Sequence, residues 1–293
     1  MELAVISGKG GTGKSSISAA FATLHENIVL ADCDVDAANL YLLFQPHHDR
    51  EEAFQSGRKA VIDYDRCADC GLCIDYCRFD AIHKEDSRVV IDAVSCDGCE
   101  LCMRICPEEA IYMEPENDSR LYSGSFRKGE MVYGRLAPGE ENSGRLVDLV
   151  RKRAKEIAAE SQIANILLDG PPGIGCPVLS TITGVDHVVI VTEPTLSGLH
   201  DLKRTVAVTR SYDIPTSVII NKYDLNEAMA NQIKAYCSFE GLMVVAMLPF
   251  DRRVVDAMVA CQSIVEYAPD SEITELLREA CRKITHGWAV GCV

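Results

Sequence analysis

The sequence has 293 residues, of which 44 are acidic and 29 basic, so its formal net charge is −15. So acidic a chain is poorly suited to non-specific binding of nucleic acid or anionic membranes. No secretory signal opens the chain, and no run reaches the roughly 18 apolar residues that span a bilayer. We therefore expect a cytoplasmic protein with no nucleic-acid partner and no stable membrane anchor, and its fourteen cysteines indicate a reducing compartment.

The first predicted strand, residues 3–7, leads into a glycine-rich loop that is followed by a helix predicted over residues 16–24. The loop has the spacing G-x4-G-K-[ST] of a P-loop, whose backbone N–H groups close around nucleotide phosphates. We expect Lys14 to reach the β- and γ-phosphates and the Ser15 hydroxyl to bind Mg²⁺. The predicted phosphate-binding residues are Gly8, Gly10, Gly11, Thr12, Gly13, Lys14, Ser15 and Ser16.

Lys9 is a second lysine, placed directly after the first glycine of the loop. This deviant Walker A pattern resembles that of the MinD, ParA, Mrp and nitrogenase-iron-protein class of P-loop ATPases. The resemblance implies a nucleotide-sandwich homodimer in which Lys9 reaches the phosphates of the partner subunit and assists catalysis. A solvated loop lysine is the alternative.

The second predicted strand, residues 28–31, ends in an acidic segment. In the same family this position is the first switch, whose carboxylate orients the attacking water or the ligands of Mg²⁺. The resemblance assigns this catalytic role to Asp34, with Asp36 as the alternative.

Two runs of cysteines follow, each spaced Cys-x2-Cys-x2-Cys-x3-Cys, and they repeat their sequence context. They resemble the cysteine runs of bacterial two-[4Fe–4S] ferredoxins. The resemblance implies one cluster on Cys67, Cys70, Cys73 and Cys106, and another on Cys96, Cys99, Cys102 and Cys77. A disulfide framework and two structural zinc sites are the alternatives, although zinc usually prefers paired Cys-x2-Cys motifs.

The cysteine runs divide the chain into two predicted domains. We expect residues 58–116 to form an inserted, small α+β ferredoxin-like domain, with strands at 59–63 and 88–92. Residues 1–57 and 117–293 would form a discontinuous P-loop ATPase domain. The flanking segments 45–57 and 116–129 are polar and turn-rich, so we predict that they are linkers.

After the insertion, predicted strands and helices alternate. The strands are 131–136, 163–169, 187–192, 216–220 and 243–248, and the helices are 144–160, 196–211 and 226–239. This alternation predicts an α/β fold with a mostly parallel sheet, helices on both faces and a ligand at the carboxyl ends of the strands. An apolar stripe over residues 273–284 predicts a last helix that packs on the core; a membrane-surface helix is the alternative.

Asp169 ends one of these strands, and the resemblance makes it the catalytic Walker B aspartate. Residues 170–173 resemble the second switch, in which the Gly173 N–H would sense the γ-phosphate. Cys176 follows at the interval where relatives of the nitrogenase iron protein hold a cluster ligand near their dimer axis. A small buried cysteine is the alternative.

The sequence Asn221-Lys-Tyr-Asp224 leaves the base ambiguous, because it is similar to the N-K-x-D motif with which GTPases bind guanine. In the MinD and Mrp family the asparagine lies against adenine, and a Pro-Phe-Asp stretch lines the other side. Asn221, Pro249 and Asp251 match that arrangement, so ATP is favoured over GTP.

Together these motifs predict an ATPase that couples nucleotide-driven dimer switching to electron transfer toward an unidentified protein partner. Its cofactors would be ATP, Mg²⁺ and two [4Fe–4S] clusters. One alternative is an ATPase that assembles iron–sulfur or other metal cofactors and delivers them to an acceptor protein. Another is a MinD- or ParA-type positioning switch with redox-sensing clusters.

Overall fold

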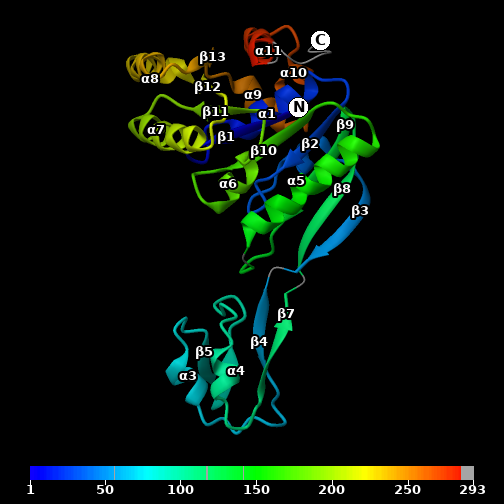
Figure 1. The fold of residues 1–293 in the computed structure, drawn as a ribbon, viewed down its shortest axis with the longest axis vertical. Coiled ribbons are helices and arrows are strands. Elements are labelled where there is room, and N and C mark those ends of the chain that lie inside the picture. The colour runs from blue at the N-terminus through cyan, green and yellow to red at the C-terminus, as the bar shows by residue number, and fades with distance from the viewer. Residues whose placement is uncertain (56, 117, 141, 285–293) are drawn as a thin grey trace. The chain divides into compact units, whose positions relative to one another are not determined.

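The computed structural model describes residues 1–55, 57–116, 118–140 and 142–284. They form two compact units (Figure 1). The larger one, called the P-loop unit, comprises residues 1–51, 121–134 and 143–293; the smaller one, called the cysteine unit, comprises residues 52–120 and 135–142. Each unit is described by itself.

The P-loop unit is built on one sheet, to which the described residues contribute nine strands. These strands are β1 (Glu2–Ser7), β2 (Ile28–Asp32), β3 (His47–Phe54), β8 (Ser119–Phe126), β9 (Gly129–Arg135), β10 (Ile166–Pro172), β11 (His187–Thr192), β12 (Thr216–Asn221) and β13 (Met243–Leu248). Their spatial order is β13-β12-β11-β1-β10-β2-β9-β8-β3.

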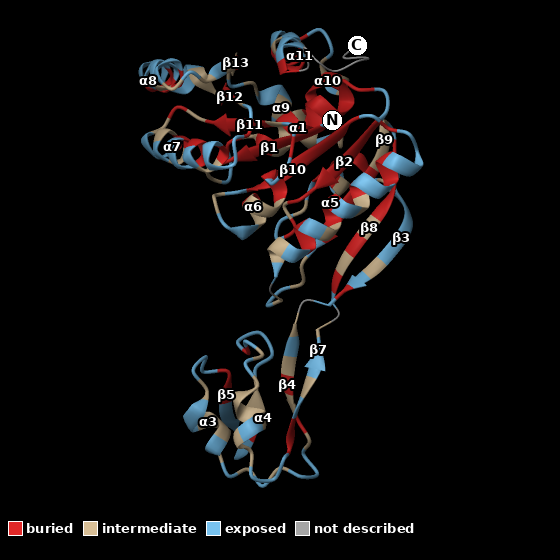
Figure 2. Ribbon diagram, viewed as in Figure 1, coloured by how far each residue is buried: buried red, intermediate tan, exposed pale blue. Residues whose placement is uncertain are grey.

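The strands from β13 to β9 pair in parallel, which confirms the predicted mostly parallel sheet. The central strands are buried (Figure 2) because they consist almost wholly of apolar residues, as parallel strands covered on both faces require.

Helices cover both faces of this sheet (Figure 1). They are α1 (Lys14–Thr23), α2 (Leu40–Phe44), α5 (Ser143–Glu160), α6 (Cys176–Ile182), α7 (Leu196–Ser211), α8 (Glu227–Phe239), α9 (Arg252–Val259), α10 (Ile264–Tyr267) and α11 (Glu272–Ile284), with a 3₁₀ turn at Tyr223–Leu225. The connection through α1 runs one way along the sheet and those through α6 and α7 run the other way. Right-handed crossovers therefore place α1 on the opposite face from α6 and α7.

The prediction that the last helix packs on the core is confirmed. In α11, Ile273, Leu277, Ala280 and Ile284 are buried in the cluster that also contains the apolar side of α1.

The prediction of linkers at 45–57 and 116–129 is wrong, because both segments contain strands of the sheet. In β8 the buried positions include Ser119 and Ser123. Because these residues are small and polar, the sequence does not show the alternation of apolar and polar residues that predicts a strand. Strand β3 lies at the edge of the sheet and is almost entirely exposed, which explains its polar sequence. The two strands approach so closely that a Cβ added at Gly124 would lie 1.9 Å from the carbonyl oxygen of His47.

The cysteine unit contains two antiparallel strand pairs. Strand β4 (Arg58–Ile62) pairs with β7 (Ile111–Pro115), and β5 (Ile82–Glu85) pairs with β6 (Arg88–Ile91). Two one-turn helices, α3 (Leu72–Tyr76) and α4 (Leu101–Ile105), each begin within a cysteine run. A small apolar core lies between these elements, and Cys96 belongs to it while Cys67, Cys73, Cys77, Cys102 and Cys106 pack against it.

Candidate functional site: a P-loop cavity and two cysteine-lined cavities

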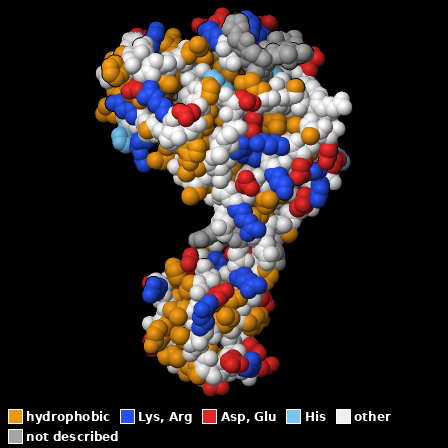
Figure 3. Space-filling model, in the orientation of Figure 1, with side chains coloured by type: hydrophobic (Ala, Val, Ile, Leu, Met, Phe, Trp, Pro, Cys, Tyr) orange, Lys and Arg blue, Asp and Glu red, His pale blue; other side chains and the backbone are white. Residues whose placement is uncertain are grey.

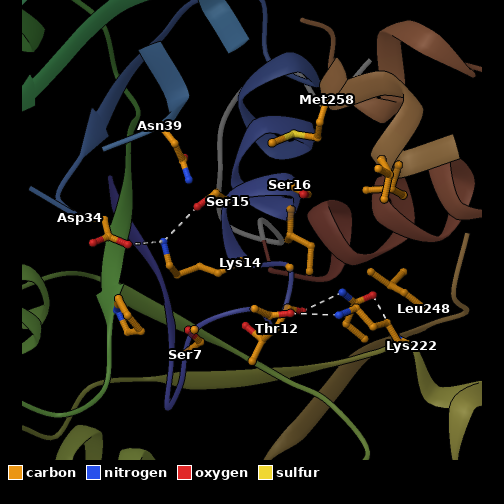
Figure 4. A pocket seen from close by; sticks show the side chains of 18 of the residues that line it. Ser7, Thr12, Lys14, Ser15, Ser16, Asp34, Asn39, Lys222, Leu248 and Met258 are labelled. Carbon is orange, nitrogen blue, oxygen red and sulfur yellow. Dashed lines mark hydrogen bonds and ion pairs between the residues drawn. The ribbon is translucent and has the colours of Figure 1, made fainter. Parts of the chain in front are cut away.

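A cavity of about 690 Å³ opens at the carboxyl ends of the P-loop unit's central strands (Figure 4). Strand order reverses beside β1, and ligands of α/β sheets bind at such a point. The cavity is lined by residues of the loop after β1, the segment after β2, the segment after β10 and the ends of β12 and β13. The predicted site residues on its wall are Gly10, Gly11, Thr12, Gly13, Lys14, Ser15, Ser16, Asp34, Asn221, Pro249 and Asp251.

Gly13 fixes the shape of the P-loop. Its φ angle is +90°, which favours glycine, and an added Cβ would lie 2.3 Å from Nδ2 of Asn221. That same Nδ2 donates a hydrogen bond to the carbonyl oxygen of Thr12 at 2.8 Å. The loop and the end of β12 therefore interlock, and only glycine fits at residue 13. Gly8 does not line the cavity; it allows the chain to pass Asp201, whose Cβ would lie 2.5 Å from an added Cβ.

Lys14 sits in a cluster of carboxylates. Its Nζ lies 2.8 Å from Asp169 and 3.9 Å from Asp34. Burial alone would lower the pKa of Lys14, but the charges of Asp169, Asp32 and Asp34 raise it overall. The lysine therefore remains a buried cation beneath the P-loop.

Asp169 lies beneath the cavity wall and is completely buried. Ser15 Oγ donates to one of its oxygens at 2.8 Å, and Ser18 Oγ donates to the other at 2.6 Å. We did not predict Ser18, although a serine on the apolar face of α1 is the kind of residue that needs a polar partner.

Asp32 is a second completely buried carboxylate that we did not single out. Its oxygens accept hydrogen bonds from the backbone N–H groups of Asp34, Asn39 and Leu40, at 3.1 to 3.2 Å. Burial, reinforced by the charge of Asp169, raises the pKa of Asp32 to about 7. Asp32 thus holds the backbone of the segment that places Asp34 on the cavity wall, and the exposed Asp36 lines the cavity beside it.

Gly173 adopts φ +95° after β10 and does not line the cavity. Its N–H donates to the carbonyl oxygen of Ser7 at 2.8 Å, which joins the segment after β10 to the end of β1. Pro171 and Pro172, the last two residues of β10, and Gly175 in the segment that follows do line the cavity.

The far side of the cavity is formed by Asn221, Lys222 and the stretch Pro249-Phe250-Asp251. Asp224 lies outside the set of lining residues, and its Oδ1 accepts the N–H of Phe250 at 2.7 Å. Asp251 caps α9 by accepting the N–H of Arg253 at 2.9 Å. Apolar residues of α9, α10 and α11 continue the wall, and we did not predict that they would: Val254, Val255, Met258, Ile264, Ile273 and Leu277.

Lys9 also lies outside the lining set. Its Nζ is 2.7 Å from Glu193 Oε1 and donates to Ser197 Oγ at 2.9 Å and Thr195 Oγ1 at 3.2 Å. Glu193 and Thr195 belong to the loop between β11 and α7, and Ser197 is the second residue of α7.

In the cysteine unit, two small cavities are each lined by four cysteines. One is lined by Cys67, Cys70, Cys73 and Cys106, and the other by Cys77, Cys96, Cys99 and Cys102. In each case the fourth cysteine comes from the other run. Over the described residues, no three His, Cys, Asp or Glu side chains converge closely enough to hold one metal ion. A single zinc ion would need all its sulfurs about 2.3 Å from one point.

Cys176 is exposed at the first residue of α6, which disagrees with the alternative of a buried cysteine. An added Cβ on Gly144, in the first turn of α5, would lie 3.5 Å from Cys176 Cβ. Within the described part of the chain, no helix is long and apolar enough to cross a membrane.

Comparison with known proteins identifies relatives. A family model described as "CobQ/CobB/MinD/ParA nucleotide binding domain" matches residues 3–263. An uncharacterized protein of Methanocaldococcus jannaschii is 35% identical, over 97% of this chain and 96% of its own length. A second uncharacterized protein of that organism is 28% identical, over 91% of this chain and 92% of its own length.

Among solved structures, the cell division ATPase MinD of Pyrococcus furiosus aligns with a TM-score of 0.58 and 16% identity, covering 97% of this chain and 98% of its own. The septum site-determining protein MinD of Pyrococcus horikoshii, solved with Mg-ADP, also has a TM-score of 0.58, with 18% identity and coverage of 97% and 96%. These likenesses concern the fold.

Proposed function

Because the chain belongs to the CobQ/CobB/MinD/ParA nucleotide-binding family, we propose that it is an ATP-dependent iron–sulfur protein. In this proposal, nucleotide-driven switching of a homodimer controls electron transfer from two [4Fe–4S] clusters to a partner protein. The observation that carries the proposal is the pair of cavities, each lined by four cysteines, in a unit inserted into a nucleotide-binding chain.

The donor sets fit iron–sulfur clusters. A [4Fe–4S] cluster takes one thiolate on each of four iron atoms, so its cysteines surround a cavity without converging on one point. Cys67, Cys70, Cys73 and Cys106 would hold one cluster, and Cys77, Cys96, Cys99 and Cys102 the other. When bound, each cluster would supply a one-electron donor and acceptor. The N–H of Ala110 donates to Cys106 Sγ at 3.3 Å, and hydrogen bonds to cluster sulfurs help set their potential.

The P-loop cavity supports nucleotide binding. Thr12 Oγ1 is buried and has no hydrogen-bond partner among the described residues, so it is available to a phosphate. Lys14 would leave Asp169 for the β- and γ-phosphates, and Ser15, now bonded to the same aspartate, would turn to Mg²⁺. Asp34 would orient the attacking water.

The base side of the cavity supports ATP. Asp224 would have to read the guanine edge in a GTPase-like site, but its Oδ1 is engaged by the backbone of Phe250 outside the cavity wall. Asn221, Pro249 and Phe250 remain to enclose adenine. Lys9 would act across the dimer, and Gly173 would exchange its bond to Ser7 for the γ-phosphate.

Anaerobic isolation tests the proposal. The intact chain should contain about eight irons, and Cys99→Ser and Cys70→Ser should each lose one reducible cluster signal in electron paramagnetic resonance. Cys261→Ser is the matched control, because this cysteine lies outside both cysteine cavities. A wild-type chain with far fewer than eight irons, or with stoichiometric zinc in their place, would contradict the cluster assignment.

The coupling between nucleotide state and electron transfer is tested by following the oxidation of the reduced protein by metmyoglobin, with Mg-ATP, with Mg-ADP and without nucleotide. We expect the rate to depend on nucleotide in the wild type and to lose that dependence in Lys14→Ala. Equal rates under all three conditions would contradict the coupling. Iron lost to an apo-acceptor during turnover would instead favour a delivery factor.

A further inference from the structure

The ammonium group of Lys9 is held by a complete set of acceptors. A lysine ammonium carries three N–H donors, and three acceptors lie within reach: Glu193 Oε1, Ser197 Oγ and Thr195 Oγ1. All three belong to residues 193–197, which are the loop between β11 and α7 and the first two residues of α7. Lys9 in this state has no donor left for a phosphate.

The acceptor loop is itself well fixed. It leaves β11, which pairs in parallel with β1, so this loop and the P-loop emerge at the same edge of the sheet. Thr195 caps α7 by accepting the N–H of Gly198 at 2.9 Å, and its own N–H donates to the carbonyl oxygen of Glu193 at 2.8 Å. A fixed acceptor loop makes the contact with Lys9 specific.

Glu193 also contacts a lysine of the cavity wall. Its second oxygen lies 3.5 Å from Nζ of Lys222, which donates to the carbonyl oxygen of Gly11 at 2.9 Å. Burial would raise the pKa of Glu193, but the bonds and charges of Lys9 and Lys222 lower it overall, so the carboxylate stays ionised. One carboxylate therefore contacts Lys9 of the P-loop and Lys222, which directly follows β12.

We propose that Glu193 is a positioning residue that holds Lys9 on its own protomer and thereby opposes nucleotide-dependent dimer formation. The inference rests on the proposed function, in which Lys9 must reach the phosphates of a second copy of this chain. A carboxylate and a phosphate compete for the same ammonium, so Lys9 must leave Glu193 before it can cross the interface. The competition stabilises the unpaired protomer relative to the dimer.

The expected size of the effect on dimer affinity follows from the solvent exposure of the Lys9–Glu193 ion pair. The side chains of Lys9 and Glu193 are 28% and 19% exposed, and exposed or partly exposed pairs of this kind change an equilibrium by up to about fivefold. Each protomer releases one lysine, so the effect counts twice. Removing the carboxylate charge should tighten the dimer by up to about 25-fold.

The experiment measures the dimer Kd of the intact, cluster-loaded protein by sedimentation, at saturating Mg²⁺ and a non-hydrolysable ATP analogue. Glu193→Gln should lower the Kd, Ser197→Ala should lower it less, and Glu193→Asp should stay close to the wild type. Glu227→Gln on α8 is the matched control for net charge, because residue 227 is exposed and lies outside this loop.

The effect must depend on Lys9. Lys9→Ala should weaken the dimer. Adding Glu193→Gln to Lys9→Ala should bring no gain in dimer affinity, because no contact between Lys9 and Glu193 remains to be broken. An equal gain in both backgrounds, or a dimer that ignores Glu193→Gln, overturns the inference and leaves the proposed function intact. If neither the wild type nor Glu193→Gln forms a nucleotide-dependent dimer, both the inference and the dimer of the proposed function are overturned. The cluster assignment is then still tested separately, by the iron content.

Discussion

At the scale of single residues, the cavity depends on a few side chains whose polar groups are almost all engaged in hydrogen bonds and ion pairs. Lys14, Ser15 and Ser18 all bind Asp169, so its two carboxylate oxygens hold the base of the P-loop together. Asp32 does the same for the segment after β2 by accepting three backbone N–H groups.

Gly13→Ala should weaken nucleotide binding, because the new Cβ would collide with Asn221 and φ +90° strains any residue with a side chain. Such strain costs about 1–3 kcal/mol, or about 5- to 150-fold in affinity. Gly184→Ala is the control, since Gly184 also has a positive φ, +74°, but does not line the cavity and an added Cβ there meets nothing within 4 Å. Fluorescent-ADP titration of both variants checks this, and equal losses would contradict it.

Asp32 should make the nucleotide-free protein less stable as pH rises. Its pKa is about 7 in the fold and about 3.9 in an unfolded chain, so between these values the folded state holds a proton that the unfolded state lacks. The free energy of unfolding should therefore fall by up to about 1.4 kcal/mol per pH unit toward pH 7 and level off above it. Urea unfolding at pH 6, 7 and 8 measures the slope, and an unchanged slope in Asp32→Asn would disprove the assignment.

At the scale of elements, residues 135–142 begin at the last residue of β9 but belong to the cysteine unit. Lys59 on β4 ties them there: its Nζ donates to the carbonyl oxygens of Cys96 and Gly139 and lies 3.3 Å from Glu116. One lysine thus joins a cysteine run to the segment that leads into α5.

Lys59→Met should release this tie and leave carbonyl groups without their charged donor, at a cost of about 1.5–3 kcal/mol. Amide hydrogen exchange should accelerate in residues 94–98 and 137–140 of the intact protein. Lys84→Met, at an exposed position of β5, should leave both segments unchanged. Identical exchange in the two variants would refute the role of Lys59.

At the scale of the whole molecule, each unit has its own apolar core. In the cysteine unit, hydrophobic side chains are exposed on the face shown in Figure 3, and Tyr76 and Phe79 line the cavity of Cys77. Exposed apolar side chains beside this proposed cluster site suit contact with another protein. The chain passes between the two units within β3 and β8, and again at the end of β9 and the start of α5.

Replacing residues 58–115 by a short Gly-Ser linker should leave a folded P-loop unit that binds Mg-ADP and contains no iron. A short linker suffices because Arg58 and Pro115 are directly paired in the antiparallel β4–β7 ladder, about 5 Å apart. Circular dichroism, nucleotide titration and iron analysis check the result. Loss of nucleotide binding in a folded product would show that the P-loop unit depends on the excised residues.

The sequence by itself determined the local features, since these depend on residues close together in the chain. The strands 187–192 and 243–248 and the helix 196–211 appear with the predicted bounds, because uninterrupted apolar runs and 3.6-residue periodicity are local signals. The P-loop could likewise be read directly, because its geometry needs glycines at fixed spacing. The ligand sets of the cysteines came from a family resemblance, and the structure lines its two cavities with the same two sets.

Tertiary structure alone decided the rest, because burial and pairing depend on residues distant in the chain. Ser119 and Ser123 look like loop residues until β8 pairs within the sheet, and Asp32 looks like any strand-end carboxylate until Asp169 is packed beside it. Glu193 carries no motif, and its contact with Lys9 exists only because β11 lies next to β1. Hydrophobic periodicity specifies which face of an element is buried, but it does not specify which polar groups meet at the ends of neighbouring strands.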